Sequence, residues 1–128
     1  MSAKDITHRP ILLLVDDDEA VGDALKFALE LEGFEVRTYP SAEALLATGL
    51  PGGDGCLVLD LNLPEMNGME LLARLRASGV RLPAILITTN PTAKTRALAL
   101  AQGAPIVEKP LLSDALLETV REVMRPAA

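Results

Sequence analysis

The sequence predicts an α/β fold: a five-stranded parallel sheet, doubly wound, with five helices over its two faces. Five short apolar segments alternate with five segments of helical spacing, and this order is typical of a parallel sheet covered on both sides. Most of the apolar segments are continuous, as strands buried on both faces are. The length of 128 residues fits one domain. We place that domain at residues 9–125.

The expected strands are the apolar segments at residues 11–15, 34–39, 56–59, 83–87 and 104–108. The first helix follows a run of acidic residues and should end at Gly33, because glycine favours helix C-termini. Ser41 and Ser113 are expected to cap the second and last helices. The turn around Gly68 leads into the third helix, and an alanine-rich fourth helix spans residues 92–102.

Composition narrows the function classes. The net charge of −6 argues against a nucleic-acid surface. Cys56 is the single cysteine, which excludes an internal disulfide and suits packing in a buried strand. His8 is the single histidine and is expected to be solvated. The polar first ten residues and the short apolar run 11–15 indicate a soluble, cytoplasmic protein without a signal peptide or membrane span.

Polar residues follow the apolar strands at the point where each ends. Asp16 and Asp17 follow the first strand, Asp60 the third, Thr88 the fourth and Lys109 the fifth. The carboxyl ends of parallel strands share one edge of the sheet, where such folds place their binding sites. The five side chains should therefore converge.

Their chemistry suits phosphoryl transfer. Three adjacent carboxylates repel one another, and a divalent cation removes this conflict. Oxygen ligands with open positions favour Mg²⁺. An ammonium and a hydroxyl would neutralise the oxygens of a transferring phosphoryl group. A carboxylate held there could act as the nucleophile and become an aspartyl phosphate.

Each residue also has a purely structural interpretation. The acidic run 16–19 could cap a helix N-terminus. Asp60 could begin an Asx turn. Thr88 could be an ordinary strand-end residue and Lys109 a solvated charge. Their joint placement after four strands favours a functional site.

Four segments resemble the receiver domains of bacterial two-component response regulators. They are ILLLVDDDEA, CLVLDLNLPEMNG, AILITT and GAPIVEKP, and their order covers the chain from Ile11 to about Met124. The phrases YPSAEALL and EKP are most similar to FixJ-type regulators. The resemblance implies a flavodoxin-like sheet with strand order 2-1-3-4-5.

The resemblance also implies roles for matching residues. Asp60 would be the phosphoacceptor. Asp17 would bind Mg²⁺ directly together with Asp60, and Asp16 would assist through water. Asn62 would offer its backbone carbonyl to the metal.

Further roles follow from the same resemblance. Lys109 would pair with Asp60 and then with the phosphoryl oxygens, and its bond to Pro110 would be cis. Thr88 would move toward the phosphoryl group and carry the signal. The donor would be a phosphohistidine of a sensor histidine kinase. The chain would catalyse only its own phosphorylation and slow dephosphorylation, so it would not be an enzyme in the usual sense.

Three positions depart from the family pattern. Ile106 occupies a switch position that is usually aromatic, so the switch coupled to Thr88 is expected to be altered. Thr89 stands where Ala or Gly is usual and could narrow access for the phosphoryl donor. Asn90, with Asn62, occupies positions at which the family tunes self-dephosphorylation.

Partners and alternatives remain open from the sequence. Leu98 and Leu100 lie on different faces of the fourth helix, so apolar surface there could dock a partner or a second copy through the fourth helix, fifth strand and fifth helix. A downstream output domain or protein would receive the signal. One alternative is a degenerate receiver that only binds a partner. Another is an aspartate-nucleophile phosphatase of the haloacid dehalogenase type, although its D-x-D-x-T motif follows a first strand, and Asp60 follows the third.

Overall fold

A computed structural model describes residues 9–52, 54–109 and 114–125. Its centre is a five-stranded parallel sheet in the order β2-β1-β3-β4-β5, which confirms the expected strand order. The strands, in chain order, are β1 (Ile11–Val15), β2 (Glu35–Tyr39), β3 (Gly55–Asp60), β4 (Ala84–Thr88) and β5 (Ile106–Glu108).

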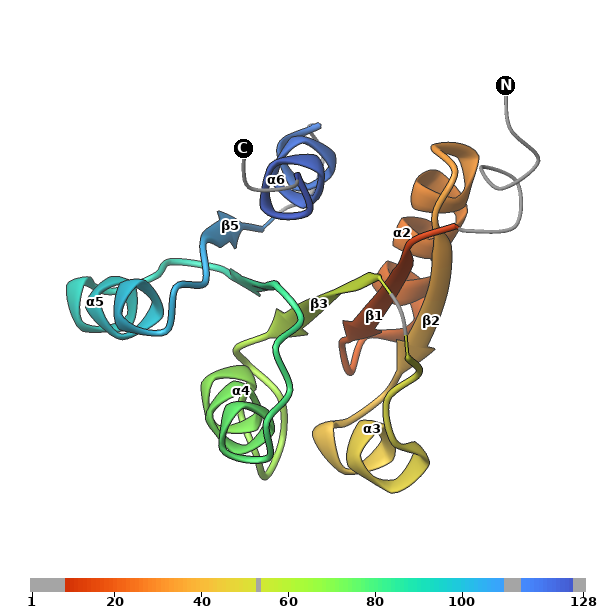
Figure 1. Cartoon of the computed structure of the whole chain (residues 1–128). Helices are drawn as coiled ribbons and strands as arrows, with labels where there is room; N and C mark the ends of the chain where they lie inside the picture. Colours follow the sequence, from red (N-terminus) through yellow and green to blue (C-terminus); the bar gives the residue numbers. More distant parts are fainter. Residues whose placement is uncertain (1–8, 53, 110–113, 126–128) are drawn as a thin grey trace.

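In the part of the chain that the structure describes, five helices connect and flank the strands. They are α2 (Glu19–Leu31), α3 (Ala42–Thr48), α4 (Gly68–Ala77), α5 (Ala93–Ala101) and α6 (Ala115–Val123). Helices α2 and α6 lie on one side of the sheet, and α3, α4 and α5 lie on the other (Figure 1). Within the described residues, none of these helices combines the length and the apolar character needed to cross a membrane.

The strand sequences explain the two layers. Successive side chains of a strand point to opposite faces, so each central strand contributes to two cores. Leu13 and Leu57 pack in the cluster beneath α3, α4 and α5, whereas Leu12 and Val58 pack in the cluster beneath α2 and α6. All four side chains are buried, which accounts for the continuous apolar runs in the sequence.

The starts of some strands differ slightly from the expected ranges. Strands β3 and β4 end at Asp60 and Thr88, as expected, whereas β3 begins one residue earlier and β4 one residue later than expected. Strand β5 begins at Ile106, two residues later than expected. Pro105 precedes it and has no N–H to donate, although its carbonyl accepts a hydrogen bond of 2.9 Å from Leu86 N.

Local capping positions the loops that carry the site. Asp18 caps α2 by accepting a hydrogen bond of 3.2 Å from Val21 N, so part of the acidic run does have a structural role. Ser41 caps α3 as expected. Gly33 has a φ of +98° just beyond α2, a backbone conformation that favours glycine. His8, Pro110 and Ser113 lie outside the described residues.

Candidate functional site

The carboxyl ends of β1, β3, β4 and β5 meet at one edge of the sheet. In the β3–β4 ladder, Asp60 lies opposite Ile87, so the next residue of β4, Thr88, stands at the same edge. Lys109 directly follows β5, and its backbone N–H donates a hydrogen bond of 2.8 Å to Thr88 O. The convergence expected from the strand order is therefore present.

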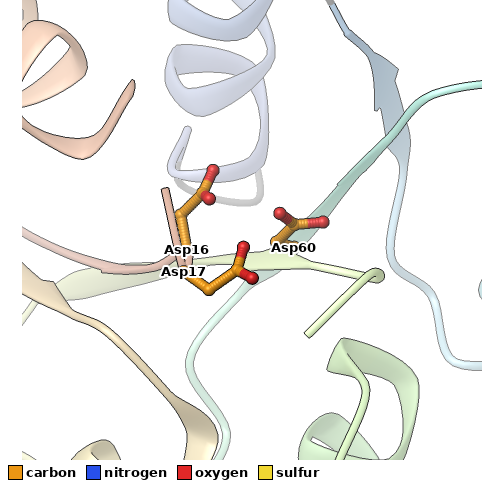
Figure 2. A group of neighbouring side chains, drawn as sticks. All are labelled: Asp16, Asp17 and Asp60. Atoms are coloured by element: carbon orange, nitrogen blue, oxygen red, sulfur yellow. The ribbon is translucent and has the colours of Figure 1, made fainter. Parts of the chain in front are cut away.

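Three carboxylates form a compact acidic cluster. Asp16, Asp17 and Asp60 each offer one oxygen, and these oxygens lie within 4.8 Å of one another. Figure 2 shows the side chains of Asp16 and Asp17, from the end of β1, gathered beside that of Asp60 at the end of β3. Asp16 and Asp60 are only 5% and 1% exposed, whereas Asp17 is exposed to solvent. Three carboxylates this close repel one another.

Lys109 is the cation of this cluster. Its Nζ donates a hydrogen bond of 2.8 Å to Asp60 Oδ2 and lies 3.3 Å from Asp16 Oδ2. Partial burial tends to lower the pKa of the Lys109 ammonium, but its bonds and charge attraction to Asp60 and Asp16 outweigh this, so the pKa is raised. Lys109 therefore remains charged beside the Asp60 carboxylate.

Asp16 has a buried oxygen without a full complement of hydrogen bonds. Its Oδ1 accepts from Asp18 N at 2.9 Å, but no described residue gives Oδ2 a hydrogen bond of good geometry, despite the Lys109 ammonium nearby. Burial raises the pKa of Asp16, and the Asp60 charge adds to this effect. A buried oxygen of this kind ordinarily has a protein, water or ion partner.

The donor set fits a magnesium ion. All three ligand groups are carboxylates, one of them is exposed, and Mg²⁺ prefers a few oxygen ligands with water in its remaining positions. A divalent charge would relieve the repulsion between the carboxylates and would satisfy the orphaned Asp16 oxygen.

Asn62 connects two residues of the site. Its backbone N–H donates a hydrogen bond of 2.8 Å to Asp60 Oδ1, and its side-chain Nδ2 donates one of 3.3 Å to Thr88 Oγ1. The family resemblance placed the Asn62 backbone carbonyl at the metal and, together with Asn90, placed the residue among the positions that tune self-dephosphorylation. The side-chain contact with Thr88 depends on the path of the β3–α4 loop, and no sequence signal indicated it.

Gly68 is a second residue whose importance the sequence did not reveal. A Cβ at this position would lie 2.5 Å from Asp60 O and 3.0 Å from Asp60 C, closer than nonbonded atoms approach. The first residue of α4 thus packs directly on the backbone of Asp60. The sequence had marked Gly68 only as part of a turn.

The three unusual positions lie around the site. Ile106 is half-buried and packs against the core beneath α3, α4 and α5. Thr89 and Asn90 are exposed. Both line a cavity of about 580 Å³ that also borders Asn62 and Thr88.

Cys56 lies away from this chemistry. It is fully buried in β3, and burial raises its thiol pKa to about 12. The interpretation of Cys56 as a packing residue is consistent with this position.

Together, the doubly wound sheet and the acidic cluster beside a lysine at its edge define a class of α/β proteins. The model of the response regulator receiver domain matches residues 12–121. The chain belongs to this family, whose members are the receivers of two-component systems and are typically phosphorylated on aspartate. This result decides against the phosphatase alternative.

Curated relatives support the same placement. The chain is 37% identical over 109 residues to the transcriptional regulatory protein FixJ of Azorhizobium caulinodans. The aligned region covers 84% of this chain and 52% of that protein. The chain is also 37% identical over 108 residues to FixJ of Rhizobium meliloti, covering 84% and 53%. The chain therefore spans about half the length of these relatives.

Solved structures share the fold. The chemotaxis protein CheY4 of Vibrio cholerae superimposes with a TM-score of 0.82 at 25% identity, covering 90% of this chain and 98% of that one. The structure described as FixJ-N superimposes with a TM-score of 0.81 at 34% identity, covering 93% and 97%.

Proposed function

We propose that this chain is a phosphorylation switch whose phosphoacceptor is Asp60. The observation that carries the proposal is the environment of this carboxylate, which is 1% exposed, bonded to the Lys109 ammonium at 2.8 Å and next to two further aspartates. A carboxylate buried with a cation and a candidate metal site suits nucleophilic attack on phosphorus.

The proposed reaction is transfer from a phosphohistidine of a sensor histidine kinase. An Asp60 oxygen attacks the phosphorus and forms a P–O bond while the P–N bond breaks. The electron pair of that bond stays on the imidazole nitrogen. In the reverse switch, water attacks the phosphorus, the P–O bond to Asp60 breaks, and the products are inorganic phosphate and a free carboxylate. The chain acts on its own phosphoryl group and not on a separate substrate.

Residues around Asp60 divide the remaining tasks. Asp17 and Asp60 with the Asn62 backbone carbonyl would hold Mg²⁺ directly, and Asp16 would hold it through water. When bound, the ion neutralises charge on the phosphoryl oxygens. Lys109 neutralises further charge on the same oxygens.

The Thr88 hydroxyl donates a hydrogen bond to a phosphoryl oxygen. Thr88 then transmits the signal together with Ile106, which takes the position of an aromatic ring. A cis bond between Lys109 and Pro110 stays a prediction, because Pro110 lies outside the described residues. The surface that responds comprises α5, β5 and α6, where Leu98 and Leu100 are 47% and 82% exposed.

The wider setting follows from the relatives. We assign the receiver domain to residues 9–125 and propose that the protein is cytoplasmic. The half-length match to FixJ suggests an output domain or protein downstream. The α5–β5–α6 surface is a candidate for pairing two copies.

The substitution Thr89→Ala tests whether Thr89 crowds the phosphoryl donor. It should speed phosphorylation by a small phosphodonor, and an unchanged rate would reject the crowding.

Mass spectrometry tests the central assignment. Acetyl phosphate with Mg²⁺ should add one phosphoryl group to the chain, in a bond that hydroxylamine cleaves. The addition should be absent from Asp60→Asn and present in Asp54→Asn, a matched change at an exposed aspartate outside the cluster. An unphosphorylated wild-type chain would favour the degenerate receiver that acts only by binding.

A further inference from the structure

Asn62 is hydrogen-bonded to Asp60 and also to the side-chain hydroxyl of Thr88. Its backbone N–H reaches Asp60 Oδ1 at 2.8 Å, and its side-chain amide reaches Thr88 Oγ1 at 3.3 Å. The two contacts come from different parts of the residue. A substitution of the side chain therefore removes the contact with Thr88 and leaves the backbone contact with Asp60 available.

The direction of the second hydrogen bond determines what Thr88 can do. The amide nitrogen only donates, so Thr88 Oγ1 is the acceptor and its own proton points elsewhere. Among residues 9–52, 54–109 and 114–125, no hydrogen bond is formed by that proton, although Thr88 is only 5% exposed. A phosphoryl oxygen on Asp60 would supply the missing acceptor.

The Asn62 side chain has no evident packing role. The residue is exposed and belongs to neither core cluster, and it borders the cavity of about 580 Å³ together with Thr88 and Thr89. Its amide is also uncharged, so it adds nothing to the charge of the acidic cluster. Its contact with Thr88 is therefore the feature that a substitution would test.

We propose that Asn62 is a positioning residue: its side-chain amide holds the Thr88 hydroxyl so that the proton is free for a phosphoryl oxygen on Asp60. This inference rests on the proposed function of Asp60 and adds a role for a side chain beyond the backbone carbonyl of the same residue. Because the hydroxyl is oriented before the phosphoryl group arrives, less rotational freedom is lost when the new bond forms.

Beryllofluoride provides the probe, because BeF₃⁻ binds a carboxylate oxygen and has the shape of a phosphoryl group. Its affinity in the presence of Mg²⁺ can be followed by NMR at the Thr88 amide. Asn62→Leu keeps the approximate side-chain size and removes the donor. It should weaken BeF₃⁻ binding about two- to ten-fold, the range expected for one hydrogen bond between neutral groups.

A double-mutant cycle separates positioning from general damage. In the Thr88→Val background, which lacks the hydroxyl, Asn62→Leu should have no further effect on BeF₃⁻ affinity. In the Thr88→Ser background, which keeps it, the effect should return. Equal effects of Asn62→Leu in all three backgrounds, or no effect in any, would overturn the proposal.

Two further measurements keep the outcomes distinct. Thermal unfolding of each variant without metal identifies a variant that has lost its fold, and Asn62→Ala then replaces Asn62→Leu. Asp60→Asn tests the underlying assignment separately. If that variant still binds BeF₃⁻ like the wild type, the proposed function fails; if it does not bind while the cycle shows no coupling, only the role of Asn62 fails.

Discussion

Lys109 Nζ lies 2.8 Å from Asp60 Oδ2, although 49 positions separate the two residues in the chain. The contact exists because β5 and β3 end at the same edge of the sheet with β4 between them. It joins a mostly buried ammonium to a fully buried carboxylate in a site that also contains Asp16. The pair is therefore both a structural tie across the sheet and the chemical centre of the proposed switch.

The first prediction concerns the Lys109 charge. Lys109→Met leaves two buried carboxylates without their cation and should lower the free energy of unfolding at pH 7 by about 3 kcal/mol without metal. The pKa of Lys109 is raised by its partners, so its stabilising effect is complete below the ordinary value of 10.5 and is lost as pH rises through the raised value. Urea denaturation of both proteins from pH 7 to pH 11 measures this.

Lys94→Met is the matched control for this prediction. Lys94 is exposed on α5, and the same substitution there should change stability by less than about 0.5 kcal/mol. Equal losses for the two lysines would mean that the contacts with Asp60 and Asp16 contribute nothing.

The second prediction concerns Asp16 and the metal. Burial raises its pKa, so the ionised side chain opposes folding at pH 7 when no cation is bound. Asp16→Asn should stabilise the metal-free chain by on the order of 1 kcal/mol. As pH falls through the raised pKa and below the ordinary value of 3.8, the wild-type carboxyl becomes neutral and the difference should vanish.

Bound Mg²⁺ should make the wild type more stable than Asp16→Asn. Thermal unfolding with EDTA and with excess Mg²⁺ should show a larger metal-dependent rise for the wild type than for Asp16→Asn. Asp23→Asn, at an exposed position on α2, should behave like the wild type. An identical Mg²⁺ response in Asp16→Asn would argue against any part for this carboxylate in metal binding.

The third prediction compares two helical glycines. Gly68→Ala would place its Cβ 2.5 Å from Asp60 O, so the α4 N-terminus or the Asp60 backbone must shift. We expect a loss of about 2 kcal/mol or more in stability together with slower phosphorylation. Gly22→Ala, whose Cβ would meet only Thr38 Cγ2 at 3.9 Å, should instead stabilise α2 by roughly 0.5–1 kcal/mol. If both changes were stabilising, the close approach at Gly68 would have no consequence.

The fourth prediction concerns Cys56. Burial raises its thiol pKa to about 12, so neither access nor thiolate is available to a reagent in the native state at pH 8. Labelling with a maleimide should be slow and should accelerate with urea in step with unfolding measured by circular dichroism. Rapid labelling of the folded chain would contradict the buried position.

Much of the fold and of the site was predictable from two simple sequence patterns. One is the continuous apolar run of a buried strand, and the other is the polar residue at the end of such a run. Continuous apolar runs predicted β1, β3 and β4 within one or two residues, and polar residues at their ends predicted Asp16, Asp60 and Thr88 as neighbours. The start of β5 was placed two residues early because the apolar segment already begins at Ala104. Pro105 has no backbone N–H to donate, and the strand begins only after it. Strand order came from the family resemblance and not from periodicity.

The sequence by itself determined which residues lie at the acidic edge of the sheet, because parallel strands present their carboxyl ends together regardless of the intervening chain. Only the tertiary structure decided which of those residues are buried and which groups they contact. It buried Asp16 while exposing Asp17, joined the Asn62 amide to the Thr88 hydroxyl and set Gly68 against the Asp60 carbonyl. These contacts depend on the paths of short loops, whose conformations follow from packing between distant segments and leave no periodic trace in the sequence.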